Sequence, residues 1–317
     1  MRVPDSMTYN NAIRYMNDSK AKLDQLAERA TSFKNFSNSS DNPSLVSSAL
    51  VLRSSIVVSN GYITTGTNSQ SWMENNETSF NLMNDLIGQA NTIMLKGVSD
   101  TVGASDRAND FAVQITQLLN QAVSIANTSY NDNFLFSGNS VKTKPFSLES
   151  FIVEPDGTET IVEDGTAEGL DEVFLRVNYA GDNSKMNRDL APGVVVSINT
   201  NGQTAFQPFF DALILAKHGL ETNDSSEMST ALSNINAALT TMNVSRTNNG
   251  AILRQIKTSN EHLTTTQKEL KGLLSIKEDA NMAEAISMFN LQQTTYQTVL
   301  DVCSRSISAL NLFDVLQ

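Results

Sequence analysis

The residue types that carry most enzyme chemistry are scarce in this chain and do not cluster. It has two histidines, His218 and His262, and one cysteine, Cys303. Neither histidine has a second histidine or a cysteine near it, so the sequence predicts no zinc site and no histidine-based catalytic site. Acidic residues such as Asp211 and the Glu278–Asp279 pair occur singly or as neighbours on different helix faces. They build neither a calcium loop nor a paired general acid and base.

Nucleotide and thiol chemistry are also poorly supported. The sequence has no G-x-x-x-x-G-K and no G-x-G-x-x-G loop to hold a phosphate. Cys303 falls within an apolar stripe, where its small side chain packs well, and its neighbours Val302 and Ser304 provide neither the cation nor the helix N-terminus that activates a catalytic thiol. Arg305 lies two residues further on. We expect a protein that is not an enzyme and binds no cofactor.

The charge balance excludes further classes of partner. The 317 residues carry a formal net charge of -12. No Lys or Arg occurs between Arg53 and Lys96, or between Arg107 and Lys142, so a cationic surface that could follow phosphates is missing. We expect no nucleic-acid partner and no binding to anionic membranes. A single cysteine also excludes an internal disulfide.

Neither a membrane span nor a secretion signal is predicted. The sequence has no apolar run of about 18 residues, the length that a membrane-spanning helix needs. Residues 1–6 lack the apolar region of a cleavable signal. The chain is therefore expected in the cytoplasm, or outside the cell by a route that removes no signal.

Apolar residues recur at intervals of three and four residues near both ends of the chain, which is the pattern of a coiled-coil seam. The first stripe is Ala12, Met16, Ser19, Leu23, Leu26, Ala30 and Phe33. The second is Ile286, Phe289, Gln293, Tyr296, Leu300, Cys303, Ile307 and Leu310.

These two stripes need partners, because isolated helices of this length are marginal in water. The ends could pair only with each other and close one bundle, or they could also assemble between subunits. We favour assembly, because two such helices expose more apolar surface than a lone pair can bury. The predicted assembly interface comprises Met16, Leu23, Leu26, Phe33, Ile286, Phe289, Tyr296, Leu300, Cys303, Ile307 and Leu310.

Between the ends, the sequence predicts helices that flank a small β-rich insert. Asp41 or Asn42 can cap a helix that Pro43 opens, and its stripe continues to residue 96 past a weak section at Gly61 and Gly66. Stripes at 108–125, 228–242 and 253–274 predict further helices, and a shorter one is expected at 209–216. Pro155-Asp156-Gly157 predicts a hairpin between strands 151–153 and 160–162, with further strands at 173–177 and 194–198.

The expected fold is mainly α, an elongated rod of antiparallel coiled-coil helices from both ends of the chain with a small β domain at its tip. Terminal segments are predicted at 1–42 and 283–317, disordered until they assemble. The helical rod core is predicted at 43–140 and 203–282, and the insertion domain at 141–202.

Several motifs along both helical arms resemble the bacterial flagellin family. Asn38–Pro43 is similar to the family's N-P-S-D-D-P turn, and Ala104–Arg107 through Ile125–Thr128 resembles its S-D-R helix that ends in I-A-N-T. Asn133–Gly138 resembles the N-x-Y-L-F-A-G strand and turn, and Lys277–Glu284 the E-D-A-D-x-A-E segment before the last helix. Each motif is moderately specific, and their common order is a strong signal.

The resemblance covers residues 1–140 and 205–317. Ser39 and Asn42 depart from the family's turn, and the β insert matches nothing by eye. At the ends, Met1–Val3 followed by Met7 and Tyr9, and the closing Asn311–Leu316, resemble the hook-associated branch that joins hook to filament. The alternative is a flagellin filament subunit, although filament proteins usually begin and end differently.

The resemblance implies a structural protein of the bacterial flagellum, located outside the cell at the hook–filament junction. It implies export through the flagellar type III apparatus without signal cleavage. The implied partners are copies of the chain in a ring, a hook-side hook-associated protein, flagellin, and a cytosolic export chaperone on the C-terminal helix. The terminal helices would become ordered when neighbours cover them.

Overall fold

The computed structural model describes residues 5–153, 159–162 and 174–315, and most of these residues are helical. The helices are α1 (Asp5–Ser32), α2 (Pro43–Gly97), α3 (Ala104–Asp106), the π-helical turn η1 (Arg107–Phe111), α4 (Ala112–Ala126), α5 (Gly202–Glu221), α6 (Ser225–Glu278) and α7 (Met282–Val315). The strands are β1 (Ser129–Tyr130), β2 (Asn133–Phe134), β3 (Phe146–Val153), β4 (Glu159–Val162), β5 (Phe174–Tyr179), β6 (Asn187–Ala191) and β7 (Val194–Ser197). The predicted class, mainly α with a β-rich insert, is confirmed.

Asparagine and aspartate side chains begin the long helices. Asn42 accepts a hydrogen bond from the Leu45 amide at 3.2 Å and caps α2, as predicted. The predicted alternative, Asp41, instead holds the preceding turn by accepting from the amides of Ser37 and Asn38. Asp224 caps α6, and Asn281 caps α7. These caps satisfy backbone donors that the first turn of a helix leaves free.

The chain divides into two compact units. Unit 1 comprises residues 1–60 and 265–317, and unit 2 comprises residues 61–264. Both boundaries fall inside the long helices α2 and α6, whereas the sequence divides the chain at residues 42 and 283. The helix α2 continues without interruption through Gly61 and Gly66, where the sequence suggested a bend or a weak point.

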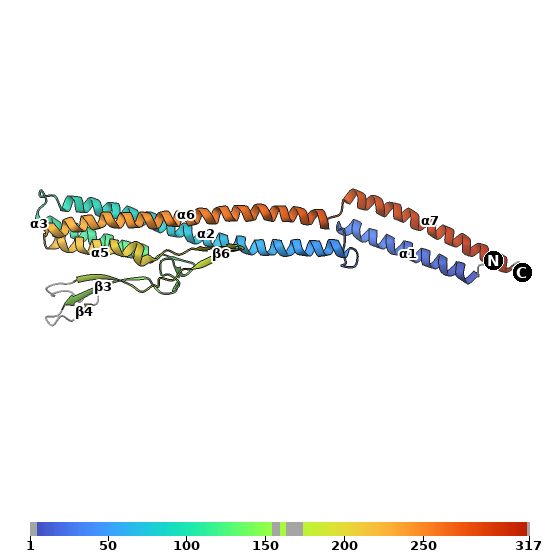
Figure 1. Ribbon diagram of the computed structural model, residues 1–317, viewed down its shortest axis with the longest axis horizontal. Helices are drawn as coiled ribbons and strands as arrows, with labels where there is room; N and C mark the ends of the chain where they lie inside the picture. The colour runs from blue at the N-terminus through green and yellow to red at the C-terminus, as the bar shows by residue number, and fades with distance from the viewer. Residues whose placement is uncertain (1–4, 154–158, 163–173, 316–317) are drawn as a thin grey trace. The chain divides into compact units, whose positions relative to one another are not determined.

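In unit 2, α2 and α6 run antiparallel along each other (Figure 1). Arg246 Nε lies 2.6 Å from the Glu77 carboxylate, and Asn91 Nδ2 donates to Asn236 Oδ1 at 2.6 Å. The helices α4 and α5 pack together beside this pair and complete a helical core. Its largest fully buried side chains are Phe80, Phe136, Phe146, Phe206, Phe209, Phe210, Met73, Met83, Ile87, Met94, Ile115 and Leu119.

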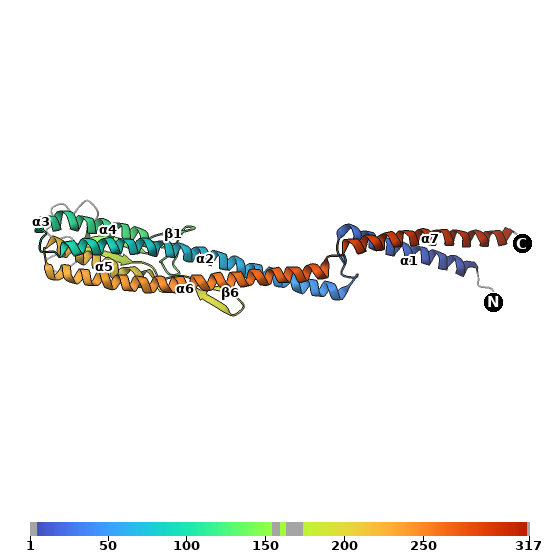
Figure 2. The ribbon, with the colours of Figure 1, turned by 90° about the horizontal axis from the view of Figure 1, so that it is seen from above.

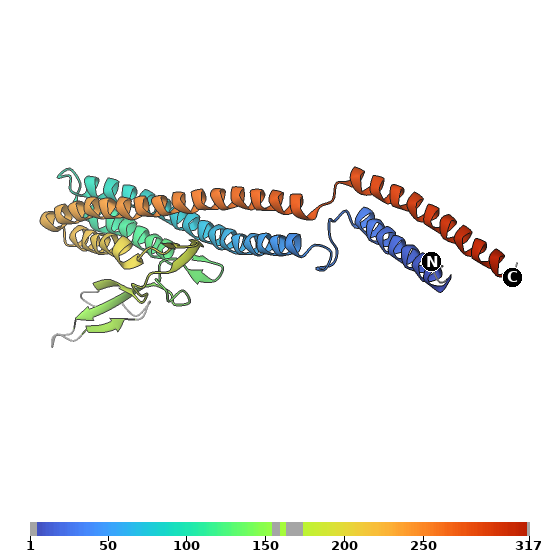
Figure 3. The same cartoon turned by 45° about the vertical axis from the view of Figure 1, so that its right-hand side comes forward.

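The β-rich insert lies on the α5 side of this bundle (Figure 3). Strands β3 and β4 pair antiparallel from Ser150↔Val162 to Val153↔Glu159, which confirms the predicted strand pair; the turn at Pro155–Gly157 lies outside the described residues. Strand β5 pairs with the other edge of β3, and β6 pairs with β7. The sequence missed β6, whose stretch Asn187–Ala191 is polar and lacks the alternation of a half-buried strand.

The turn after β2 is held by contacts with β5 and the segment that follows it. The Asp182 carboxylate accepts hydrogen bonds from the amides of Asn139 (2.8 Å) and Ser184 (2.9 Å), and these bonds lower the pKa of Asp182. Gly138 has φ +73° and packs against Asp182, so a side chain there would be strained and would clash. Burial raises the pKa of Tyr179 to about 12, and its hydroxyl donates to the Phe136 carbonyl at 2.9 Å.

Candidate assembly interface

The two terminal helices pair with each other in unit 1. Gln292 Nε2 of α7 donates to both Ser19 O (3.2 Å) and Ser19 Oγ (3.1 Å) of α1. Further along, Cys303 Sγ donates to Ala12 O at 3.6 Å, so α7 runs antiparallel to α1 (Figure 2). The polar contact inside the seam fixes one register of the pair.

On α1 the seam uses the residues that the sequence indicates. Ala12 and Ser19 are buried, and Met16, Leu23, Leu26 and Ala30 are half-buried. Phe33 lies just beyond the last turn with φ 56°, and 44% of it is exposed. It therefore takes no full part in the seam of the single chain.

On α7 the seam differs in phase from the predicted stripe. The residues turned away from solvent are Ala285, Phe289, Gln292, Tyr296, Val299 and Cys303. Of the predicted residues, Phe289, Tyr296 and Cys303 belong to this seam, whereas Ile286 is 44% exposed and Leu300 38% exposed. The side chains of Ile307 and Leu310 lie outside the described residues.

Exposed apolar side chains are concentrated in unit 1. Of 23 large apolar side chains that are exposed among the described residues, 16 lie in unit 1, although unit 1 is the smaller unit. They are Met7, Tyr9, Tyr15, Phe33, Leu50, Val51, Val57, Val58, Leu273, Ile276, Met282, Ile286, Met288, Leu291, Leu300 and Val302. The sequence missed many of them because they lie beside the seam rather than in it.

The described part of unit 1 also lacks a core of its own. Its buried apolar residues are the alanines Ala12, Ala49 and Ala285, while every large, fully buried side chain named above belongs to unit 2. Apolar patches of this extent on a soluble protein mark contact surfaces. The described part of unit 1 is therefore the candidate for contact with other protein.

An ionic cluster joins the end of α1 to the end of α6. Lys34 Nζ lies 2.9 Å from Glu278 Oε1 and 2.7 Å from Asp279 Oδ1, and Arg53 NH2 lies 2.7 Å from Glu278 Oε1. Hydrogen bonding to Arg53, aided by Lys34, lowers the pKa of Glu278 although partial burial opposes the shift. Lys34 lowers the pKa of Asp279, and Asp279 with Glu278 raises the pKa of Lys34. The Asn35 amide adds a 2.7 Å hydrogen bond to Glu278 O.

Acid is expected to loosen this cluster. Because the pKa values of Glu278 and Asp279 are lowered in the folded chain, the two carboxylates stabilise the cluster fully at pH values above their pKa in the unfolded chain, near 4. This stabilisation is lost as the pH falls through their pKa values in the folded chain. The raised pKa of Lys34 means that its contribution is complete below about pH 10 and is lost only as pH rises further. Hydrogen exchange at the Asn35 and Ala280 amides, corrected for its intrinsic pH dependence, should show protection at pH 7 that falls at pH 3.

A matched variant separates this effect from general acid unfolding. Glu278→Gln combined with Asp279→Asn should show at pH 7 the weak protection that the native chain shows only at pH 3, with unit 2 unaffected. Equal protection of the native chain at both pH values would contradict the role given to these carboxylates.

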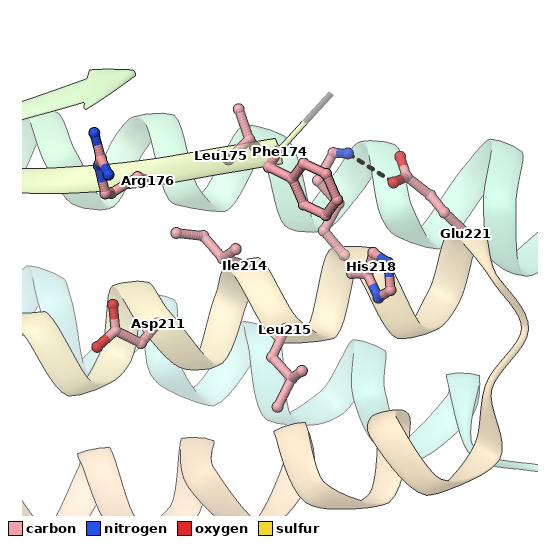
Figure 4. Close-up of a pocket in the computed structure, with 9 residues that line it drawn as sticks. Phe174, Leu175, Arg176, Asp211, Ile214, Leu215, His218 and Glu221 are labelled. Carbon is pink, nitrogen blue, oxygen red and sulfur yellow. Dashed lines mark hydrogen bonds and ion pairs between the residues drawn. The ribbon is translucent and has the colours of Figure 1, made fainter. Parts of the chain in front are cut away.

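Two residues considered for catalysis line a cavity of about 410 Å³ between α5 and β5 (Figure 4). His218 and Asp211 both face it from α5, but each is already paired. His218 Nδ1 lies 2.6 Å from Glu227 Oε2, and Asp211 Oδ1 accepts from Gln207 Nε2 at 2.9 Å. The lining residues include no Ser, Thr or Cys that this histidine could activate.

The described residues form neither a metal-binding cluster nor a membrane-spanning helix. His, Cys, Asp and Glu side chains form no group of three that could hold a metal ion within residues 5–153, 159–162 and 174–315. No helix in the same ranges combines the length and apolar character needed to cross a bilayer. His262 is exposed on α6.

Known protein families match both arms of the chain. The bacterial flagellin N-terminal helical region matches residues 3–141, and the bacterial flagellin C-terminal helical region matches residues 232–313. The chain belongs to the bacterial flagellin family. The two matched regions contain α1, α7 up to residue 313 and the ionic cluster, so the terminal helices of this flagellin-family chain fall almost entirely within the family's shared part. Most of the β-rich insert lies between the matched regions.

Individual relatives agree with this family. A stretch of 150 residues is 27% identical to flagellar hook-associated protein 3 of Escherichia coli K12, and it covers 47% of this chain and 47% of that protein. The chain thus matches about half the length of that relative.

Solved structures support the flagellin-family fold. FlgL of Bacillus cereus is 18% identical, with a TM-score of 0.56 over 71% of this chain and 99% of that chain. A protein of Vibrio parahaemolyticus assigned as flagellar hook-associated is 14% identical, with a TM-score of 0.61 over 75% of this chain and 99% of that chain. At these identities the likeness concerns the fold alone.

Proposed function

We propose that this chain is a structural subunit of the bacterial flagellum, a hook-associated protein 3 that joins the hook to the flagellin filament. The observation that carries this proposal is the surface of unit 1, whose described residues expose 16 large apolar side chains and bury no apolar side chain larger than alanine. The 150-residue match to a hook-associated protein supports the junction over the filament. The role is mechanical, and no catalytic step belongs to it.

The subunit would assemble head-to-tail as a ring, because a closed or growing tube requires each copy to offer a surface different from the one it receives. A hook-side hook-associated protein would lie on one side of the ring and flagellin on the other. Before export, a cytosolic chaperone would cover the apolar rows of α7. Passage through the flagellar type III apparatus would then place the protein outside the cell.

The free subunit is expected to hold its terminal helices loosely. The fully buried residues of the α1–α7 seam are small, namely Ala12, Ser19 and Ala285, and its larger apolar residues are only half-buried, so the pairing of the two helices leaves part of their apolar surface uncovered. The non-helical links at 33–42 and 279–281 are accessible sites for cleavage. Brief proteolysis should therefore remove both ends and leave a core of about 240 residues. Resistance of both ends equal to that of the core would contradict this expectation.

The assignment is tested by locating the protein on intact flagella. Gold labelling of an epitope-tagged chain should give a single band at the distal end of the hook. Signal along the whole filament would identify a filament subunit and overturn the junction assignment. Absence from flagella in a motile strain that expresses the tagged chain would overturn the structural role altogether.

A further inference from the structure

The seam between α2 and α6 changes character partway along the two helices. Toward the core of unit 2, α2 contributes large residues such as Met73 and Phe80, which are fully buried. Further toward its N-terminus, the buried residues of α2 are all small, namely Ser69, Gly66, Ser59 and Ala49. We call residues 59–70 of α2 together with residues 257–267 of α6 the polar section.

The facing residues of α6 in the polar section are mostly polar, and Leu263 is the one buried apolar residue among them. Asn260 places its side-chain amide over Gly66, in the space that a Cβ on Gly66 would occupy. Asn260 Oδ1 is buried without a hydrogen-bond partner. Gln267 Nε2 donates to Asn60 Oδ1 at 3.4 Å, a long hydrogen bond. Close packing here therefore depends on a glycine, and it gains little from apolar burial.

Two boundaries coincide with this section. The continuous apolar core of unit 2 ends at Trp72 on α2 and at Ile256 on α6. The chain divides into its compact units at residues 60/61 and 264/265. A seam with few large apolar contacts transmits little cooperativity, because few stabilising contacts connect the parts of the helices before and after it.

We propose that the polar section separates two cooperative folding blocks. Residues between Trp72 and Ile256 open together in a single transition, and the parts of the long helices at 43–58 and 268–278 open without them. The Gly66–Asn260 contact sets the register at which the two helices meet the core. This inference does not depend on the proposed function, and the experiment below uses the isolated chain.

Hydrogen exchange of the full-length chain, followed by mass spectrometry, tests the proposal. Amides in 45–58 should exchange about 100-fold faster than amides in 73–94 of the same continuous helix. Gly66→Ala should displace the Asn260 side chain and raise exchange about tenfold in 60–70, with 73–94 unchanged. Adding Asn260→Ala to that variant should restore the native exchange rates, because it removes the clashing amide.

The matched control is Gly61→Ala on the same helix, where an added Cβ meets no atom within 4 Å. It should leave exchange unchanged or slow it, because alanine favours the helix more than glycine does. Uniform protection from 45 to 94 would overturn the proposal. So would a Gly66→Ala variant that leaves 60–70 unchanged, or one that accelerates 73–94 by the same factor as 60–70.

Discussion

Leu300→Asp is expected to leave the isolated subunit folded and to abolish its incorporation into flagella. Leu300 is 38% exposed and lies beside the seam that α7 forms with α1, so the monomer can hydrate a carboxylate at this position. In the assembled state a neighbouring subunit would cover the same position, and burial of an unpaired charge costs several kcal/mol. Because every copy in a ring repeats the contact, the penalty applies at each interface.

The measurement has two arms. Circular dichroism and unfolding of the purified variant should match the native chain, and cells that carry only the variant should lose motility and the labelled band on flagella. Thr294→Asp is the matched control, because Ser287, Thr294 and Asp301 form an exposed polar row on the same helix that already carries a carboxylate. Normal motility with Leu300→Asp, or an equal loss with Thr294→Asp, would contradict the assigned interface.

The helices of this protein could be predicted because their signals are local. Pro43 opens α2 and Asn42 caps it, as the turn chemistry indicates, and the helix ends at Gly97 where the stripe breaks. The apolar spacing also places the α1 seam correctly from Ala12 to Ala30. Each of these signals depends only on residues within one or two helical turns, so it can be recognised from the sequence without knowledge of tertiary contacts.

The α7 seam could not be predicted in the same way, because α7 carries adjacent apolar rows. Ile286 and Leu300 lie in one row of the helix, and Phe289, Tyr296 and Cys303 lie in the next. The predicted stripe therefore combined residues of two adjacent rows. Only the position of α1 decides which row is covered within the chain. The exposed row then becomes the better candidate for contact with another subunit.

The boundary between the two units also could not be predicted from sequence patterns within one helix. Gly61 and Gly66 suggested a weak section because glycine has a poor helix propensity, yet α2 continues through both. What changes there is the seam, from large apolar residues to small and polar ones. That change becomes evident only when the facing residues of α6, such as Asn260, are known.

Phe206→Ala is expected to destabilise unit 2 by about 3–5 kcal/mol, since removal of a buried aromatic side chain leaves a cavity that the surrounding core fills only in part. Phe206 is fully buried, and its ring lies 4.7 Å from Phe136, 5.8 Å from Phe80 and 6.2 Å from Phe146, measured between ring centroids. Phe206 lies on α5, Phe80 on α2, Phe146 on β3 and Phe136 in the turn after β2. The cavity would therefore weaken packing between several elements of unit 2. Urea unfolding should show the loss as a lower midpoint.

The single tryptophan of the chain, Trp72, reports on this unit, because it lies at the edge of the same core. Its fluorescence follows the unfolding of unit 2 separately from the terminal helices. Leu82→Ala is the control, because Leu82 is 50% exposed beside the buried Met83 and its truncation should change stability by about 0.5 kcal/mol or less. If both variants lowered the midpoint by the same small amount, the aromatic cluster would not be what holds unit 2 together.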